Sequence, residues 1–242
     1  MSALRIVRVR TLDLTALEPA ALDRCRAVLT DEERDRAARF AFPVNRLEYE
    51  AAHGLLRQEL AAELAATWGG GPADLVFGAP LEGSKPVLEW PRVPGLDFNI
   101  SHTTGMVACA IAWNCAVGID LEPLDRRVQI SIAQRFFAPQ EYAWLMALDD
   151  AAREPAFLQL WTLKEAVAKA VGRGLQLGFE TFSVHPQPPR LTALPSEAGS
   201  LADWTLRQWQ PAPGHLAAVA VRGQDGAPPP VFDIVPGRIS LE

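Results

Sequence analysis

The sequence predicts an α+β fold. Segments typical of strands gather in runs, first at 4–12 and then at 96–100, 106–113 and 116–122, and segments with helical spacing stand between these runs. The regular alternation of one strand with one helix, which a doubly wound parallel sheet requires, does not occur. Hydrophobic residues make up 49% of the 242 residues, enough to bury the core of one large domain or of two small ones.

The first half of the chain is expected to begin with a strand and to continue with helices. Residues 4–12 alternate apolar and basic side chains, as a strand does, and 14–29 follow with helical character. Thr30 and Glu33 have the spacing of a capping box, so a short helix is expected to begin there. From 45 to 68 the apolar residues recur at helical spacing, and a glycine-rich segment ends this helix.

The second half is expected to contain three helices, a further strand and a closing hairpin. In chain order these are helices at 128–137, 139–148 and 155–171, a glycine-containing loop at 172–178, and strands at 179–185, 204–210 and 216–222. The proline-rich tail from Gly226 is expected to run along the surface. Each half, 1–112 and 113–242, then holds a long helix and several strands, which is compatible with two similar lobes.

The composition limits the class of partner and the compartment. Lys and Arg number 23 against 29 Asp and Glu, and the net charge of −6 argues against a nucleic-acid partner, although it allows a local basic pocket. The N-terminal segment lacks a long apolar stretch, and no run reaches the ~18 apolar residues of a membrane span. The three cysteines form no CxxC pair, which indicates reduced thiols. A cytoplasmic protein without a membrane partner is therefore expected.

The segment Gly118-Ile119-Asp120-Leu121-Glu122 carries the first candidate site. In a strand, Asp120 and Glu122 share a face and lie about 6–7 Å apart along the chain. Two carboxylates on one face repel unless a cation lies between them, and an oxygen-only site suits a hard ion such as Mg²⁺. Taken alone, the motif also fits an ordinary solvated strand end.

The second candidate lies on the predicted helix 155–171. Trp161, Glu165 and Lys169 follow one another at i, i+4 spacing and therefore share one helical face. Glu165 can supply a third carboxylate, and Lys169 a phosphate contact one turn later. The alternative is a surface ion pair that contributes a few tenths of a kcal/mol, on the order of other such helical pairs.

Ser101 and His102, in the segment FNISHT, form the third candidate. Neighbours in a strand point to opposite sides and no GxSxG motif is present, so a serine-hydrolase pair is not expected. A hydroxyl and an imidazole at a strand end can instead bind a phosphate, or belong to a turn with a satisfied histidine. Upstream, in the segment GSKP, Pro86 stiffens the loop directly after Lys85, which makes Lys85 a fourth candidate. The alternative is an ordinary solvated loop.

The order of these motifs resembles that of the Sfp-type 4′-phosphopantetheinyl transferases. The segments are, in chain order, SKP, FNISH, GIDLE, FFAPQEY, WTLKEAVAKAVGRGL and FETFSV, and the similarity runs from about residue 32 to residue 184. GIDLE and WTLKEA, with their spacing, are its most specific part. The resemblance implies two similar α/β lobes related by a pseudo-twofold axis, 1–112 and 113–242, with the active site in the cleft between them and the metal site on the second lobe.

The resemblance also implies an activity and roles for residues. Such an enzyme moves the 4′-phosphopantetheine arm of coenzyme A to a serine of an apo carrier protein, releases 3′,5′-ADP and depends on Mg²⁺. The implied magnesium ligands are Asp120, Glu122 and Glu165, and Lys169 and His102 join them in catalysis. Coenzyme A is expected to contact Arg36, Arg46, Lys85, Pro86, Ser101, His102 and Lys169. Glu141 and Lys164 match further active-site positions.

Two residue roles stay open at this point. Glu33 occupies a position where the best-known member of the family has a basic residue thought to meet the 3′-phosphate, which leaves Arg36, with or without Arg39, to make that contact. Glu165 is either a third magnesium ligand or the base that takes the serine proton. The ligand role is favoured because a carboxylate held against Mg²⁺ has a depressed pKa and makes a poor base.

The function also has alternatives. A non-catalytic module that binds coenzyme A or a carrier is expected to have lost one of the three carboxylates, and an unrelated magnesium hydrolase of nucleotides would need no carrier. The sequence does not name the carrier, which belongs to fatty acid, polyketide or nonribosomal peptide synthesis or to another pathway. Two lobes in one chain allow the enzyme to act as a monomer.

Overall fold

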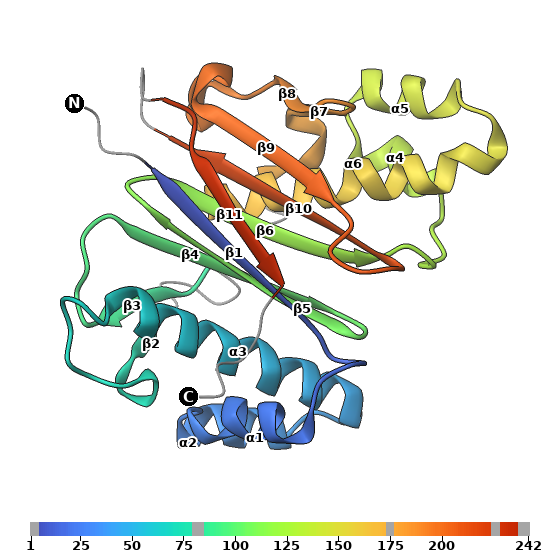
Figure 1. Ribbon diagram of the computed structural model, residues 1–242. Helices are drawn as coiled ribbons and strands as arrows, with labels where there is room; N and C mark the ends of the chain where they lie inside the picture. The colour runs from blue at the N-terminus through green and yellow to red at the C-terminus, as the bar shows by residue number, and fades with distance from the viewer. Residues whose placement is uncertain (1–4, 79–84, 173–176, 224–227, 237–242) are drawn as a thin grey trace.

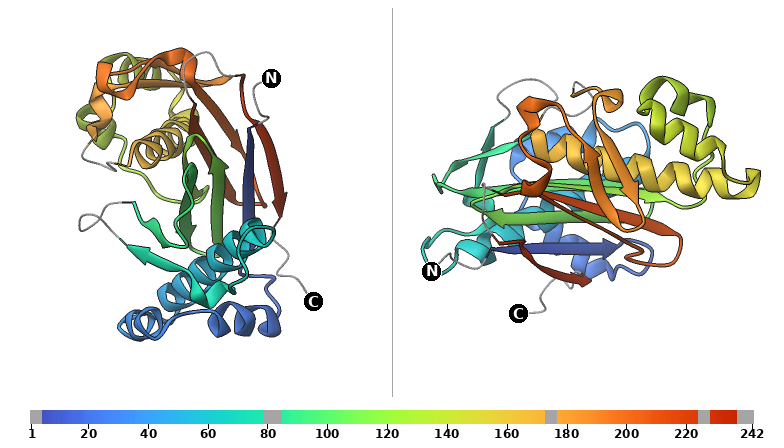
Figure 2. Two further views of the ribbon diagram at one scale, coloured as in Figure 1. Left: turned by 90° about the vertical axis from the view of Figure 1, so that its left-hand side faces the viewer. Right: turned by 90° about the horizontal axis from the view of Figure 1, so that it is seen from above.

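The computed structural model describes residues 5–78, 85–172, 177–223 and 228–236 of the chain. Two β-sheets lie against each other in it, and each has a long helix packed on its outer side (Figure 1, Figure 2). Helices and strands are mixed along the chain without regular alternation. The predicted α+β class is therefore confirmed.

The first sheet joins segments from both ends of the chain. Its strand order is β11-β1-β5-β4, from β1 (Ile6–Asp13), β4 (Leu96–Thr103), β5 (Met106–Trp113) and β11 (Val231–Pro236). Neighbouring strands are antiparallel except β11, which runs parallel to β1. The sequence predicts only a surface tail where β11 forms, because prolines at 228–230 and Pro236 flank its short apolar run, and proline is typical of loops and of edge strands.

Among the described residues, three α-helices precede β4 along the chain: α1 (Pro19–Ala27), α2 (Asp31–Ala38) and α3 (Pro43–Leu64). The predicted capping box is present, since the Thr30 side chain accepts from the N–H of Glu33 and the Glu33 carboxylate accepts from the N–H of Thr30. α3 packs on β4 and β5, and α1 packs on α3. Gly54 permits the second contact, because a Cβ there would lie 2.4 Å from the Cβ of Cys25.

The second sheet has the order β6-β10-β9, from β6 (Ala116–Pro123), β9 (Trp204–Trp209) and β10 (His215–Arg222), all antiparallel. The predicted closing hairpin is therefore confirmed as β9–β10. After β6 come α4 (Ser131–Phe136), α5 (Pro139–Met146) and α6 (Asp150–Val171), and α6 packs along β6 and β10. α6 begins before its predicted start at 155, so Pro155 lies inside the helix. The helix tolerates this proline because the backbone hydrogen bond that it removes is close to the N-terminal end.

Two small sheets complete the fold: β2 (Val76–Gly78) with β3 (Val87–Trp90), and β7 (Ser183–Pro186) with β8 (Pro189–Ala193). The strand predicted at 179–185 is half right, because Phe179–Thr181 forms a 3-10 turn. Further 3-10 turns lie at Pro72–Asp74, Ser196–Ala198 and Leu201–Asp203. Within the part of the chain that the structure describes, no helix combines the length and apolar character that crossing a membrane requires.

In the described ranges, three apolar clusters hold these layers together. One lies between α3 and the first sheet, one between α6 and the second sheet, and one between the sheets, where Ala110 and Ile119 belong to the same cluster. The three cysteines are free and buried, as the sequence predicts. β11 belongs to the second half of the chain, but it pairs with β1 in the first sheet. The first sheet therefore contains residues from both sides of the predicted boundary between 112 and 113. That boundary and the pseudo-twofold relation stay predictions.

Candidate active site

A cavity of about 550 Å³ opens where the ends of β4 and β6 meet α2, α3 and α6. It gathers side chains that are far apart in the sequence and that include most of the predicted site. The lining residues are Arg36, Phe40, Tyr49, His53, Ile100, Ser101, His102, Thr103, Asp120, Leu121, Glu122, Arg126, Trp161, Glu165 and Lys169. The cavity therefore brings together the selected residues of GIDLE and FNISH with Trp161, Glu165 and Lys169 of the helix that carries WTLKEA, whereas Lys164 of that motif lies outside its lining.

Gly118 explains why α6 comes so close to β6. A Cβ at this position would lie 2.1 Å from the carbonyl oxygen of Ala166, so a hydrogen atom fits there and a methyl group does not. Because side chains alternate along a strand, the two carboxylates of the motif lie on the same helix-facing side of β6 as Gly118. Glu165 and Lys169 stand on either side of Ala166 along α6. The close contact at one glycine thus brings the helix side chains to the strand carboxylates.

Asp120 is the centre of a buried hydrogen-bond network. The Nζ of Lys169 donates to Asp120 Oδ1 at 2.6 Å and to Ser101 Oγ at 3.1 Å, and the Ser101 hydroxyl donates to the same carboxylate oxygen at 3.3 Å. Asp120 is 5% exposed, and its other oxygen, Oδ2, has no hydrogen-bond partner among the described residues. One oxygen of this carboxylate is therefore satisfied and the other is open.

Glu122 and Glu165 extend the acidic wall. The Glu122 carboxylate pairs with Arg126, whose guanidinium lies 5.5 Å from the centre of the Trp161 ring. Glu165 is half-buried, and no hydrogen bond or ion pair joins it to another residue in the described ranges. Three carboxylates therefore share two cations, Lys169 and Arg126.

Burial raises the pKa of all three carboxyl groups. For Glu165 the pKa rises to about 7, first through desolvation and then through the charge of Asp120. Desolvation also comes first at Asp120, where Lys169 opposes the rise, and at Glu122, where the charge of Asp120 adds to it. Such an excess of buried negative charge is typical of a site that gains a cation when it binds its ligands.

The three carboxylates are not arranged as a finished metal site. Among the described residues, no group of three or more His, Cys, Asp or Glu side chains is placed to hold a metal ion. Lys169 and Arg126 instead engage Asp120 and Glu122. The donor chemistry does fit Mg²⁺, since the set offers carboxylate oxygens alone and the Oδ2 of Asp120 is unpartnered.

His102 faces α3, on the side of β4 opposite to Ser101. Its Nδ1 lies 3.5 Å from Oε2 of Glu48, and the other oxygen of Glu48 is buried without a hydrogen-bond partner in the described structure. Burial lowers the pKa of His102, and the Glu48 carboxylate opposes this effect. Glu48 cannot be recognised from the sequence, because a single glutamate in an amphipathic helix carries no signal that it faces a distant histidine.

The two arginines predicted to contact coenzyme A lie in different environments. Arg36 lines the cavity, and its guanidinium is 5.7 Å from the centre of the Tyr49 ring. Arg46 is exposed, pairs with Glu50 at 2.7 Å and is not among the residues that line the cavity. The role of Arg46 in binding coenzyme A stays a prediction.

Lys85 lies near the start of β4, away from the cavity lining. Its Nζ donates to Asp97 Oδ2 at 2.5 Å and to the carbonyl oxygen of Val117 at 2.7 Å. Pro86 is half-buried beside it, whereas the first two residues of the motif, 83 and 84, lie outside the described residues, as do 173–176 of the predicted glycine loop. The coenzyme A contacts expected from Lys85 and Pro86 stay predictions.

Glu33 has structural partners that account for an acidic residue at this position. Its carboxylate lies 2.8 Å from Nε of Arg57 and 3.3 Å from Nδ1 of His53, and it caps α2 at Thr30. Although desolvation acts in the opposite direction, these bonds lower the pKa of Glu33 to about 2. Since Arg57 is 2% exposed, Glu33 neutralises a buried guanidinium. Arg36 is the basic residue of α2 that lines the cavity.

Glu141 and Lys164 form a buried pair outside the cavity lining. Lys164 Nζ lies 2.8 Å from Glu141 and donates to the carbonyl oxygen of Phe182, while Glu141 accepts from the N–H groups of Ala138 and Val184. Desolvation lowers the pKa of Lys164 to about 8, against the effect of Glu141. The pair therefore connects α6 to α5 and β7.

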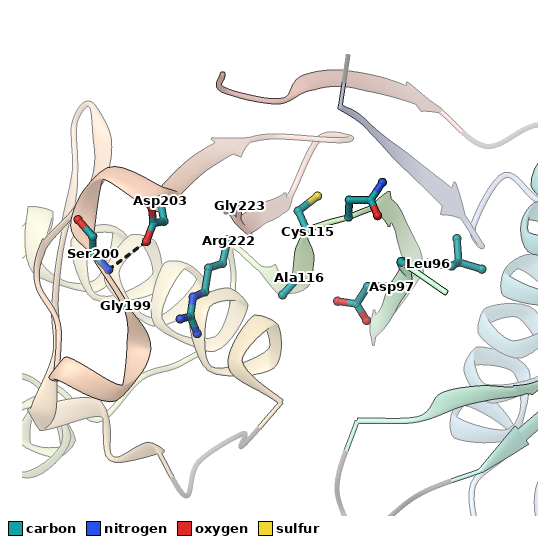
Figure 3. Close-up of a pocket in the computed structure, with 11 residues that line it drawn as sticks. Leu96, Asp97, Cys115, Ala116, Gly199, Ser200, Asp203, Arg222 and Gly223 are labelled. Carbon is teal, nitrogen blue, oxygen red and sulfur yellow. Dashed lines mark hydrogen bonds between the residues drawn. The ribbon is translucent and has the colours of Figure 1, made fainter. Parts of the chain in front are cut away.

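A second cavity, of about 830 Å³, lies at the other end of β4 and β6 (Figure 3). Asp97, Asp203 and Arg222 contribute both signs of charge to its wall, along with Cys115 and several glycines. It is larger than the first cavity, but it lacks the cluster of carboxylates with raised pKa values. The first cavity is therefore the stronger candidate for catalysis.

Comparison with known proteins agrees with the motifs. Residues 116–220 match the model of the 4′-phosphopantetheinyl transferase superfamily. The 4′-phosphopantetheinyl transferase HetI of Nostoc is 36% identical over 201 residues, covering 81% of this chain and 80% of that protein. A 4′-phosphopantetheinyl transferase of Bacillus subtilis is 35% identical, covering 67% of this chain and 68% of that protein. The solved holo-acyl-carrier-protein synthase of Thermotoga maritima is more remote, at 22% identity and a TM-score of 0.38, covering 45% of this chain and 63% of that one.

Proposed function

Because the chain belongs to the 4′-phosphopantetheinyl transferase superfamily, we propose that it transfers the 4′-phosphopantetheine arm of coenzyme A to a serine of an apo carrier protein and releases 3′,5′-ADP. One observation supports this most strongly: the cavity joins Asp120, Glu122 and Glu165 to Lys169 and Ser101 in the segments that carry the family motifs. The carriers are proposed to serve fatty acid, polyketide or nonribosomal peptide synthesis.

The reaction is an in-line displacement at phosphorus. The serine hydroxyl of the carrier attacks the β-phosphate of coenzyme A, a new P–O bond forms, and the P–O bond to the departing 3′,5′-ADP breaks. The serine proton passes to a carboxylate of the cavity or to a water molecule bound there. Positioning and charge neutralisation lower most of the barrier in reactions of this kind. Lys169, Ser101 and His102 are proposed to donate hydrogen bonds to phosphate oxygens, and Arg36 to contact the 3′-phosphate. Support for Lys169 comes from its Nζ, which is held at the cavity wall by Asp120 and Ser101.

Mg²⁺ is the proposed cofactor, with Asp120, Glu122 and Glu165 as its ligands. The raised pKa values of these groups and the unpartnered Oδ2 of Asp120 support this assignment. When bound, the ion would neutralise charge on the phosphate oxygens and on the leaving group. Full activity in excess EDTA would remove the metal from the proposal.

The enzyme is proposed to act as a cytoplasmic monomer, with coenzyme A and a carrier as its partners and without a nucleic-acid or membrane partner. The net charge of −6 supports a surface that does not bind nucleic acid. It also means that docking of an acidic carrier cannot rest on net charge, so apolar contacts near the cleft are expected to dominate.

Light scattering during size-exclusion chromatography measures the mass of the particle in solution, and therefore tests the proposed monomer. A dimer would correct the proposed state.

The activity is tested by mass spectrometry of several apo carrier proteins after incubation with coenzyme A and Mg²⁺. A mass gain of one phosphopantetheine arm is expected with the wild-type enzyme and with Asp150→Asn, whose carboxylate is exposed at the start of α6. Asp120→Asn, the same chemical change inside the cavity, should give no gain. Breakdown of coenzyme A without a carrier would indicate a hydrolase, and binding without transfer would indicate a non-catalytic module.

A further inference from the structure

The two sheets meet beside the cavity without a backbone ladder. β4 is the edge strand of the first sheet and β6 the edge strand of the second. An edge strand leaves alternate N–H groups unpaired unless another group accepts from them, and buried N–H groups are almost always paired. Here three side chains of β4 accept from β6: Asp97 from the N–H of Val117 at 2.8 Å, Asn99 from Ile119 at 2.9 Å and Ser101 from Leu121 at 3.2 Å.

This arrangement, called here the β4 side-chain ladder, follows from the pleat of the two strands. Its three acceptors are two residues apart and so share one face of β4, while Phe98, between two of them, points into the core against α3. The three N–H groups alternate along β6 and point away from β10, its partner in the second sheet. Asn99 is the middle rung and is 5% exposed. The ladder therefore replaces backbone pairing at the junction.

We infer that Asn99 is a positioning residue for the transfer reaction, because it fixes the register of β6 against β4. This inference rests on the proposed function. A slip of one residue would move the carboxylate of Asp120 to the opposite face of its strand. The neighbouring rung cannot hold the register by itself, since the Ser101 hydroxyl also serves Lys169 and Asp120.

Asp97, at the far end of the ladder, connects the same register to the lysine of the SKP motif. Its Oδ2 accepts from both the N–H of Val117 and the Nζ of Lys85, and Lys85 also donates to the carbonyl oxygen of Val117. Asp97 lines the second cavity (Figure 3), so its replacement would change two things at once. Asn99 lines neither of the two cavities and is the cleaner position for a test.

The test compares acceptors at position 99. Asn99→Leu keeps the size of the side chain but has no acceptor. Asn99→Ala also lacks the acceptor and, being smaller, causes no crowding. Asn99→Ser supplies a hydroxyl acceptor like that of Ser101, the next rung. We expect kcat to fall by about 30-fold or more in the Leu and Ala variants, with KM for coenzyme A changed by less than about threefold, because small misplacements of reacting groups carry losses of this size. The Ser variant should recover most of the kcat.

The control is Ser183→Ala, which removes a buried side-chain hydrogen bond to Gln140 far from the junction. It should lower Tm without lowering kcat. An equal fall of kcat in this control and in Asn99→Ala, at equal loss of Tm, would reduce Asn99 to a stabilising residue. If Asn99→Leu does not fold, Asn99→Ala decides the outcome, and wild-type kcat in a folded Asn99→Ala overturns the inference.

Amide hydrogen exchange tests the ladder without activity. In Asn99→Ala the N–H of Ile119 should exchange faster, while that of Asp120, which points to β10, keeps its protection. Unchanged protection of Ile119 overturns the ladder, whatever the activity. A wild-type enzyme that modifies no carrier contradicts the proposed function alone, and the exchange result still stands or falls by itself.

Discussion

Two sets of buried carboxylates in this protein differ in how their charge is balanced. Glu33, between α2 and α3, meets Arg57 and His53, and Glu50 of α3 meets Arg26 of α1 and Arg46 of its own helix. Both pKa values are lowered despite desolvation. At β6 and α6, by contrast, three carboxylates share Lys169 and Arg126, and all three pKa values are raised.

The difference teaches that burial alone does not separate a structural acid from a functional one. Desolvation is the first cause in both sets, so the number of cations in contact decides the direction of the pKa shift. A compensated carboxylate stabilises the fold when it is ionised. An under-compensated one opposes folding when it is ionised, and a bound cation would relieve that cost.

The largest expected effect comes from the under-compensated set. Asp120→Asn should lower kcat/KM by about 10³-fold or more, roughly 4 kcal/mol of transition-state stabilisation. It should leave Tm within a few degrees of the wild type, since the variant removes a buried charge that the fold compensates poorly. Steady-state kinetics and calorimetry measure the two quantities. A large loss of Tm with normal kinetics would place Asp120 in the compensated class instead.

Glu33→Gln is the matching change in the compensated set, and the reverse result is expected. The neutral side chain leaves Arg57 buried without its charge partner, which should lower the free energy of unfolding by about 3–5 kcal/mol. Activity per folded molecule should stay within about threefold of the wild type, on the order of a change outside the chemistry. Urea unfolding gives the stability, and a kcat lowered 100-fold at full folding would contradict the assignment.

The free energy of unfolding at acid pH should also depend on Glu33. Because folding lowers its pKa from 4.5 to about 2, the ionised group contributes stability that is complete above pH 4.5 and is lost as the pH falls toward about 2. The contribution is on the order of 3 kcal/mol. Glu33→Gln should therefore show a flatter loss of stability over that interval. Parallel acid profiles for the wild type and the variant would exclude this role.

Glu165 should respond to pH in the opposite direction. Because folding raises its pKa from 4.5 to about 7, its ionisation lowers stability increasingly between pH 4.5 and 7. In EDTA, Glu165→Gln should be more stable than the wild type above pH 7 by on the order of 1–2 kcal/mol, less than the full pKa shift would give because solvent screens this half-buried group, with no difference near pH 4.5. Unfolding measured at both pH values tests this, and a variant less stable at pH 7 would contradict it.

The same variant separates the two roles left open for Glu165. If Glu165 is a magnesium ligand, Glu165→Gln should need more Mg²⁺ for half-maximal rate and should recover partly at high metal. If it is the base, its metal dependence should be unchanged while kcat falls and the acidic limb of the pH–rate profile disappears. Wild-type values of both quantities would leave Glu165 with neither role.

The smallest expected effect is at Arg36, which lies on α2 with Glu33 and lines the cavity that holds the three carboxylates of β6 and α6. With Glu33 engaged by Arg57, Arg36 is the α2 side chain proposed to contact the 3′-phosphate. Arg36→Ala should weaken binding of coenzyme A by about tenfold, or about 1.4 kcal/mol, and leave binding of 3′-dephospho-coenzyme A unchanged. Calorimetry with both ligands makes the comparison, and equal losses for the two would assign the contact elsewhere.

The sequence by itself determined the elements and the motif residues, because these depend on local patterns. The capping box at Thr30 and Glu33, the strands that carry FNISH and GIDLE, and the helix that carries WTLKEA are all readable from spacing. The resemblance of the motifs pointed to the family that the comparisons then established. The strand β11 was missed, because the prolines that flank its short apolar run are more typical of a surface loop.

Only the tertiary structure decided which buried charges are compensated and what holds the site together. Nothing in the sequence shows that the pKa values of Glu33 and Glu165 diverge, because distant residues supply cations to one and carboxylates to the other. Likewise, Asn99 faces the N–H of Ile119 across a junction between two sheets, and Gly118 admits α6 to within contact of β6. Contacts of this kind join residues of separate elements, so no local pattern encodes them.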